Sequence, residues 1–154
     1  LLVQRLGIKP AEMTADVLTA WLRQNPTEAR ELLRQNRSYV FFRIADELDP
    51  ADGPIGAAGV PVTAGRTLAV DRSLWSFGLP VWLEGEVPDP AGGSRPLRRL
   101  SIAQDTGSAI TGPGRGDLFF GSGDEAGRAA GLLRNDVRFV VLWPKPDPTL
   151  VRTP

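Results

Sequence analysis

Histidine and cysteine are both absent from the 154 residues of this chain. Without histidine, Ser-His-Asp and Cys-His catalysis are excluded and the commonest ligand of catalytic zinc is missing. Without cysteine there are no thiol nucleophiles, zinc-thiolate sites or disulfides. The absence of cysteine does not indicate the cellular compartment, because such a chain tolerates any redox state. Acid–base chemistry must therefore use Asp or Glu, since Lys9, Lys145 and Tyr39 are the only lysines and tyrosine. We expect no metal and no cofactor.

Net charge and long apolar runs are also absent. The 18 basic and 18 acidic residues cancel, and nucleic-acid binding depends on a basic surface, so no nucleic-acid partner is expected. No apolar run approaches the roughly 20 residues of a membrane-spanning helix. The opening residues contain neither Met nor an export signal of the usual three-part form. We therefore expect the chain to come from the middle of a longer protein.

The residues that are present predict one domain with a helical appendage, because the chain is 42% hydrophobic and of moderate length. Residues 14–35 have the apolar spacing of two short helices. Thr14 is the expected cap of the first, while Asn25 as cap, Pro26 at the first position and Glu28 in the capping-box place begin the second.

The rest of the chain has the character of β-structure. A helix over residues 124–133 interrupts it, with Ser122 and Glu125 placed as a capping box. A Pro-rich tail closes the chain and is expected to be loose. Short strands are expected over residues 38–44, 60–71 (strand, turn, strand), 79–87, 97–105, 117–120 and 137–143. Five or six such strands predict a small β-barrel or sandwich.

Two glycine motifs suggest nucleotides, and both are discounted. Residues 107–112 have P-loop spacing, but Pro113-Gly114 follows where Lys-Ser/Thr would hold phosphate and Mg²⁺. Residues 121–126 fit G-x-G-x-x-A between a strand and a helix, yet a Rossmann half needs alternating β and α elements. Acidic residues at the start of the helix would also oppose a pyrophosphate. No nucleotide is expected.

Three aspartates remain as candidates for chemistry. Asp71 follows a strand and has the simple interpretation of a turn residue, and Asp105 before Thr106-Gly107 fits an Asx turn. Asp117 opens the apolar strand "DLFF", where loss of solvation would favour the protonated acid that a glycosidic oxygen needs. From the residues alone, a catalytic and a structural Asp117 are equally well supported.

The segments "AVDRS" (69–73), "AQDTGSAITG" (103–112) and "DLFFGSGDEAG" (117–127) together resemble the three-aspartate domain of the membrane-bound lytic murein transglycosylase A family. "SYVFFR" (38–43), the segment 53–71 and "VRFVVLW" (137–143) are similar to that family too. The resemblance covers roughly residues 10–145 and rests on the combination of motifs rather than on "DTG" alone.

The resemblance implies a mainly β fold, a double-psi β-barrel with a second domain inserted into it. This chain would carry the later part of the barrel, without its N-terminal strands and preceded by a short helix pair. The implied organisation is residues 1–37 as the helical end of the inserted domain, 38–145 as the three-aspartate domain and 146–154 as a Pro-rich tail. An exposed strand edge and marginal stability in isolation would follow.

The implied function is a peptidoglycan lytic transglycosylase. Such an enzyme cleaves the β-1,4 bond between N-acetylmuramic acid and N-acetylglucosamine and leaves a 1,6-anhydromuramic end. The family's catalytic acid/base falls on Asp117, and Asp71 and Asp105 would support the site by binding backbone N–H groups. Thr106, Gly107, Ser108 and Ala109 are the expected substrate-binding residues.

The expected partner is a peptidoglycan glycan strand, and the expected place is the periplasmic side of the cell envelope, either outer-membrane-associated or periplasmic. A lipid anchor on the parent protein stays open. Trp75, Trp82 and Phe119 are candidates for sugar stacking, with the hydrophobic core as the simpler interpretation of each. The alternative function is a glycan-binding or structural double-psi barrel without turnover, because fold alone does not decide activity.

Overall fold

The computed structural model describes residues 2–7, 9–37, 40–45, 48–49, 52–89, 92–133 and 135–145. The chain divides into two compact units, Leu1–Asp46 and Glu47–Pro154. The expected tail over residues 146–154 lies outside the described residues. No helix in the described part of the chain is both long and apolar enough to cross a membrane.

The first unit is helical. Its elements are α1 (Leu2–Leu6), the 3-10 helix η1 (Pro10–Glu12), α2 (Ala15–Gln24) and α3 (Pro26–Arg34). The expected helix pair is confirmed as α2 and α3, and the Thr14 hydroxyl caps α2 by accepting a bond of 3.2 Å from the Val17 N–H. Asn25 and Pro26 hold the expected cap and first positions of α3, but the Asn25 side chain makes no capping bond, because its amide donates to the Trp21 carbonyl at the end of α2.

The strand expected over residues 38–44 is also wrong for its described part. Residues 40–45 belong to no strand or helix, and Ser38 and Tyr39 lie outside the described residues. Phe41 and Phe42 are each 93% exposed. The apolar composition is that of a strand, but a strand needs a neighbour with which to pair its backbone, and no described residue provides one.

The second unit is built on one five-stranded sheet with the order β4-β1-β3-β2-β5. Its elements are β1 (Thr67–Val70), β2 (Pro80–Pro88), β3 (Ser94–Asp105), β4 (Gly116–Leu118), α4 (Asp124–Gly131) and β5 (Arg138–Val141). The mainly β character with a few helices is as expected. Of the two strands expected over residues 60–71 only β1 forms, and the earlier part makes a single bridge between Ile55 and Pro61.

A long hairpin of β2 and β3 forms the middle of the sheet. The two strands pair antiparallel from Pro80↔Ile102 to Pro88↔Ser94 across a turn that contains Gly92 and Gly93, both with positive φ. Alternate residues on one face are buried and form the core with β1. The core consists of Leu68, Val70, Val81, Leu83, Val87, Leu97 and Ala103.

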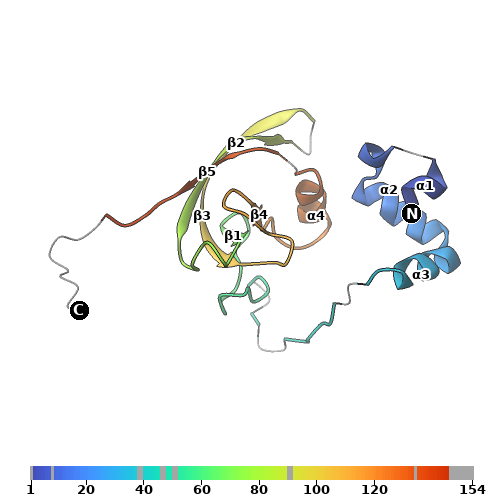
Figure 1. Ribbon diagram of the computed structural model, residues 1–154, viewed down its shortest axis with the longest axis horizontal. Coiled ribbons are helices and arrows are strands. Elements are labelled where there is room, and N and C mark those ends of the chain that lie inside the picture. Colours follow the sequence, from blue (N-terminus) through green and yellow to red (C-terminus); the bar gives the residue numbers. More distant parts are fainter. Residues whose placement is uncertain are drawn as a thin grey trace. The chain divides into compact units, whose positions relative to one another are not determined.

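The sheet is strongly curved, and α4 lies on its concave side (Figure 1). The side chain of Phe139 on the edge strand β5 reaches the other edge strand, because a Cβ added to Gly116 on β4 would lie 3.1 Å from a Phe139 ring carbon. The Ser122 capping box is wrong: Gly123 is the residue before α4, with φ 88°, and no side chain caps the helix.

Candidate functional site

Asp105 and Asp117, twelve positions apart in the sequence, lie opposite the same residue of the sheet. Ala69 on β1 pairs with Asp105 of β3 on one side and with Asp117 of β4 on the other. Directly paired residues project to the same face. Two strand spacings separate the two aspartates, which corresponds to about 9–10 Å between their Cα atoms.

A β-bulge brings Asp105 to this face. β1 runs parallel to β3 with Thr67↔Ile102 and Leu68↔Ala103, but the next pair is Ala69↔Asp105, so Gln104 is an extra residue. In an unbroken ladder Ala69 would face Gln104, and Asp105 would project to the same face as the core residue Ala103. The bulge therefore places both aspartates on the same face of the sheet.

A small pocket of about 270 Å³ lies between these two carboxylates. Ala69 is 7% exposed and its methyl group is short, so the space between its two neighbours stays open. The pocket is lined by Thr67, Ala69, Asp105, Thr106, Ile110, Asp117, Leu118 and Phe119. Of the three aspartates, Asp71 is the one that this pocket does not include.

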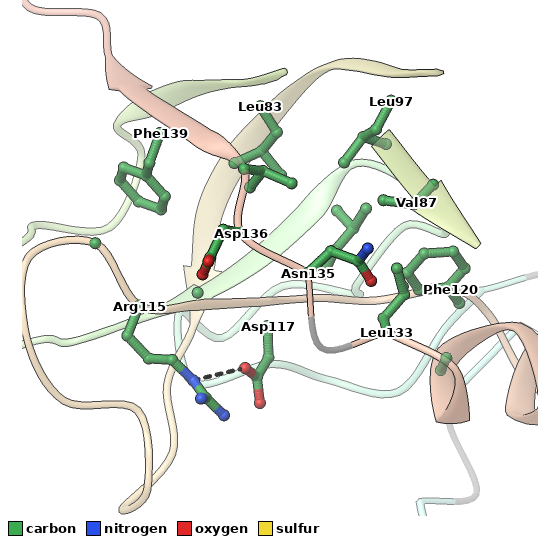
Figure 2. Close-up of a pocket in the computed structure, with 15 residues that line it drawn as sticks. Leu83, Val87, Leu97, Arg115, Asp117, Phe120, Leu133, Asn135, Asp136 and Phe139 are labelled. Carbon is green, nitrogen blue, oxygen red and sulfur yellow. Dashed lines mark ion pairs between the residues drawn. The ribbon is translucent and has the colours of Figure 1, made fainter. Parts of the chain in front are cut away.

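Asp117 is exposed, which corrects the expectation that it is desolvated. Its side chain is 55% exposed, and its carboxylate makes an ion pair of 3.2 Å with Nε of Arg115. Residues two apart in an extended segment share a face, which brings this arginine beside the acid. Asp117 also lines a larger cavity of about 710 Å³, whose lining combines Arg115, Asn135 and Asp136 with apolar core residues (Figure 2).

Asp71 holds two loops together at the end of β1. Its Oδ2 accepts a bond of 2.7 Å from the Gly112 N–H, and its Oδ1 accepts bonds from the Ser73 hydroxyl and the Ser73 N–H. The Ser73 hydroxyl bond, followed by the two backbone bonds, lowers the pKa of Asp71 below its usual 3.8. Asp71 therefore fixes the loop that leads from Asp105 to Asp117.

Asp105 and Thr106 are also held by backbone groups. Oδ1 of Asp105 accepts a bond of 3.0 Å from the Ala57 N–H, and the Thr106 hydroxyl donates to the Val70 carbonyl at 2.8 Å. Of the four residues expected to bind substrate, Thr106 lines the small pocket, whereas Gly107, Ser108 and Ala109 are exposed and line neither pocket described above.

The three aromatic candidates occupy different environments. Trp75 packs against the core cluster and its indole N–H donates to the Pro113 carbonyl at 3.1 Å. Phe119 lines the small pocket. Trp82 is partly buried on β2, between Leu100 and Val140 on the neighbouring strands.

The arrangement offers one exposed acid, Asp117, beside a cation and across a small pocket from a second carboxylate. No group of three or more His, Cys, Asp or Glu residues within the described ranges could hold a metal ion. An exposed carboxyl group beside a pocket can give and take a proton, and general acid–base chemistry is what these two aspartates can supply. The site also contains Arg115, Gln104 and Ala69, which are not among the residues predicted from the sequence. The spacing Arg-x-Asp in an extended segment could have predicted the first of them.

Comparison with known proteins first defines the class. Residues 66–143 match the family model of the 3D domain, and residues 1–43 match that of the MltA specific insert domain. The 3D domain match spans half of the chain and contains Asp71, Asp105 and Asp117. The chain is thus a 3D domain protein.

The relatives then define the family. The chain is 32% identical over 153 residues to membrane-bound lytic murein transglycosylase A of Vibrio cholerae and 34% identical over 150 residues to that of Escherichia coli K12. A membrane-bound lytic murein transglycosylase from Agrobacterium tumefaciens superposes with a TM-score of 0.74 at 44% identity over 93% of this chain and 39% of its own. The chain belongs to the membrane-bound lytic murein transglycosylase A family.

A further solved structure contains a bound sugar. Escherichia coli MltA with bound chitohexaose superposes with a TM-score of 0.80 at 30% identity, over 94% of this chain and 42% of its own. The alignments with the Vibrio and Escherichia relatives cover 96% and 94% of this chain but 40% and 39% of those proteins. The chain therefore spans about two fifths of the curated relatives that it matches.

Proposed function

We propose that this chain carries the catalytic acid of a peptidoglycan lytic transglycosylase, with Asp117 as general acid and then general base. The observation that carries the proposal is the pairing of Asp105 and Asp117 on either side of Ala69, above a pocket of about 270 Å³. The names of the relatives and the chitohexaose bound to one of them support a glycan as substrate. The substrate would be the β-1,4 bond between N-acetylmuramic acid and N-acetylglucosamine.

One carboxyl is sufficient for this reaction. Asp117 gives its proton to the glycosidic oxygen, the bond from C1 to that oxygen breaks, and the muramic C6 hydroxyl oxygen bonds to C1. The Asp117 carboxylate then takes the proton from this hydroxyl, and a 1,6-anhydro ring results. Because the attacking hydroxyl belongs to the same sugar, effective molarities on the order of 10⁵ M can replace an external nucleophile. A glycan that covers the exposed Asp117 would exclude water from the acid.

The two other aspartates support this acid. Asp71 fixes Gly112 and Asp105 fixes Ala57 through backbone N–H groups, so both would act on the shape of the site. Thr106, which lines the pocket, and the exposed Gly107, Ser108 and Ala109 beside it would contact the sugar.

The finer details of fold and location belong to the same proposal. Residues 38–145 would form the later part of a double-psi β-barrel, and the approach of Phe139 on β5 to Gly116 on β4 is consistent with a sheet that curls toward closure. Residues 1–37 would end an inserted domain. The parent would act on the periplasmic side of the cell envelope, and the membrane-bound relatives favour an anchor on it.

The test is digestion of purified peptidoglycan by the full-length protein, with mass analysis of the muropeptides. We expect anhydro ends, which are lighter than hydrolysed ends by one water. Asp117→Asn should lower the rate by about 10²- to 10⁴-fold or more, because the amide cannot give up a proton. The matched control is Asp124→Asn, an exposed aspartate at the start of α4 that lines neither pocket described above.

Three other outcomes would contradict the proposal. Hydrolysed ends would indicate that Asp105 activates a water, since carboxylates about 6.5–9.5 Å apart are typical of inverting glycosidases. Binding of chitohexaose without any cleavage would favour a glycan-binding barrel. Near-normal turnover by Asp117→Asn would remove this residue from its role.

A further inference from the structure

The bulge at Gln104 is held by a hydrogen-bond relay that no catalytic step uses. The Thr67 hydroxyl donates to Oε1 of Gln104 at 2.7 Å and accepts from the Thr63 N–H at 2.9 Å. Thr67 is 1% exposed. A buried hydroxyl that both donates and accepts is fixed in orientation, so it fixes the side chain of the bulged residue.

The backbone of the bulge has its own partner. An extra residue in a ladder leaves its backbone groups unpaired, but the Gln104 carbonyl accepts a bond of 2.9 Å from the Ala58 N–H. The preceding N–H, that of Ala57, donates to the carboxylate of Asp105. Consecutive N–H groups of one loop therefore hold the bulged residue and the aspartate that follows it.

We infer that Thr67 and Gln104 are positioning residues, which set Asp105 on the face of the sheet that Asp117 occupies. Thr67 lies two residues before Ala69 on β1 and lines the pocket itself. Its bond to Gln104 stabilises the bulged register, and the bulged register gives Asp105 its direction. This inference rests on the proposed function for its effect on catalysis, but the geometry of Asp105 can be measured without any substrate.

The experiment removes the relay from either end in the full-length protein. Thr67→Val keeps the shape and loses the hydroxyl, and Gln104→Met keeps the length and loses the acceptor. Each should lower kcat by about tenfold to a hundredfold, the effect of a misplaced site group, with KM within about twofold of wild type. The double variant should lose no more than either single variant, because both remove one interaction. Thr67→Ser should restore kcat to within about twofold.

The control is Ser101→Ala, on the same strand as Gln104. Ser101 is fully buried and its hydroxyl has no hydrogen-bond partner among the described residues. Loss of that hydroxyl should leave kcat unchanged. A lower kcat in Thr67→Val would then be specific to the Thr67 hydroxyl and not a general effect of removing a buried hydroxyl.

Amide hydrogen exchange tests the geometry directly. In Thr67→Val the Ala57 N–H should exchange at least tenfold faster than in wild type, while the amides of the β2–β3 hairpin keep their protection. Unchanged exchange at Ala57, or equal loss of protection at Ala57 and in the hairpin, would overturn the inference. So would wild-type kcat in both single variants. A wild-type protein that leaves peptidoglycan intact would instead overturn the proposed function, and the exchange result would still decide the role of Thr67.

Discussion

Gly56 lies against the bulge, and its replacement by alanine gives the sharpest structural prediction. A Cβ at this position would lie 2.8 Å from the Gln104 carbonyl oxygen and 2.9 Å from a methyl carbon of Val62. Ordinary contacts begin near 3.4 Å, so the loop must move away by about half an ångström or more. Because the obstacle is backbone rather than the end of a side chain, the Ala57 N–H should be drawn away from Asp105.

The cost of this overpacking is about 1–3 kcal/mol in the free energy of unfolding. The free energy of unfolding falls by about 2 kcal/mol per molar urea, so the urea midpoint of Gly56→Ala should be lower than that of wild type by about 0.5–1.5 M. The matched control is Gly114→Ala, whose Cβ would meet nothing within 4 Å and whose φ is not positive. It should gain about 0.4–1 kcal/mol from the stiffer unfolded chain. Equal midpoints for the two variants would refute the close approach of this loop to the bulge.

Three further predictions concern the loops around the site. The carboxylate bonds that lower the pKa of Asp71 stabilise the fold above pH 3.8 and are lost as the pH falls through the lowered value. The gap in urea midpoint between wild type and Asp71→Asn should therefore be constant near neutral pH and shrink below about pH 3.8; a gap that widens on acidification would contradict this. Trp75→Phe keeps the packing but loses the bond to Pro113, so urea unfolding should show a loss of about 1 kcal/mol. Arg115→Gln breaks the ion pair with Asp117, whose side chains are 57% and 55% exposed. The free energy of unfolding should therefore change by less than about 1 kcal/mol. A larger loss of stability would show that the bond to Asp117 is stronger than an exposed ion pair.

The parts of the fold that local pattern determines could be predicted from the sequence. Residues 79–87 begin with an apolar run that favours a strand, and the Pro- and Gly-rich segment after them supplies the turn, so the β2–β3 hairpin follows from neighbours in sequence. Helices α2 and α3 follow from their periodicity in the same way. The prediction of a strand over 38–44 is wrong for its described part, because apolar composition indicates only that a segment can pair with another strand. Pairing also needs a partner.

The parts that depend on distant pairing could not be predicted. Nothing within β1 indicates that it runs parallel to β3, or that Gln104 is skipped in the ladder, because register is set jointly by strands far apart in sequence. Asp105 and Asp117 could thus be predicted as site residues from the sequence, but their pairing with the same alanine could not. The apolar neighbours Leu118 and Phe119 predict a desolvated Asp117, but the carboxylate instead forms an exposed ion pair with Arg115.

The position of β1 between β4 and β3 has a consequence for the order of folding. Both of its neighbours, β3 and β4, are made after it, and roughly 35 residues separate its end from the end of β3. At about 5–20 residues per second, β1 leaves the ribosome several seconds before its first partner is complete. The hairpin of β2 and β3 can close within microseconds of its synthesis, so it forms the template, and the parallel docking of Leu68 and Val70 onto it becomes the slow step. The two aspartates acquire their common face only at that step, so the site is among the last parts of the molecule to assemble.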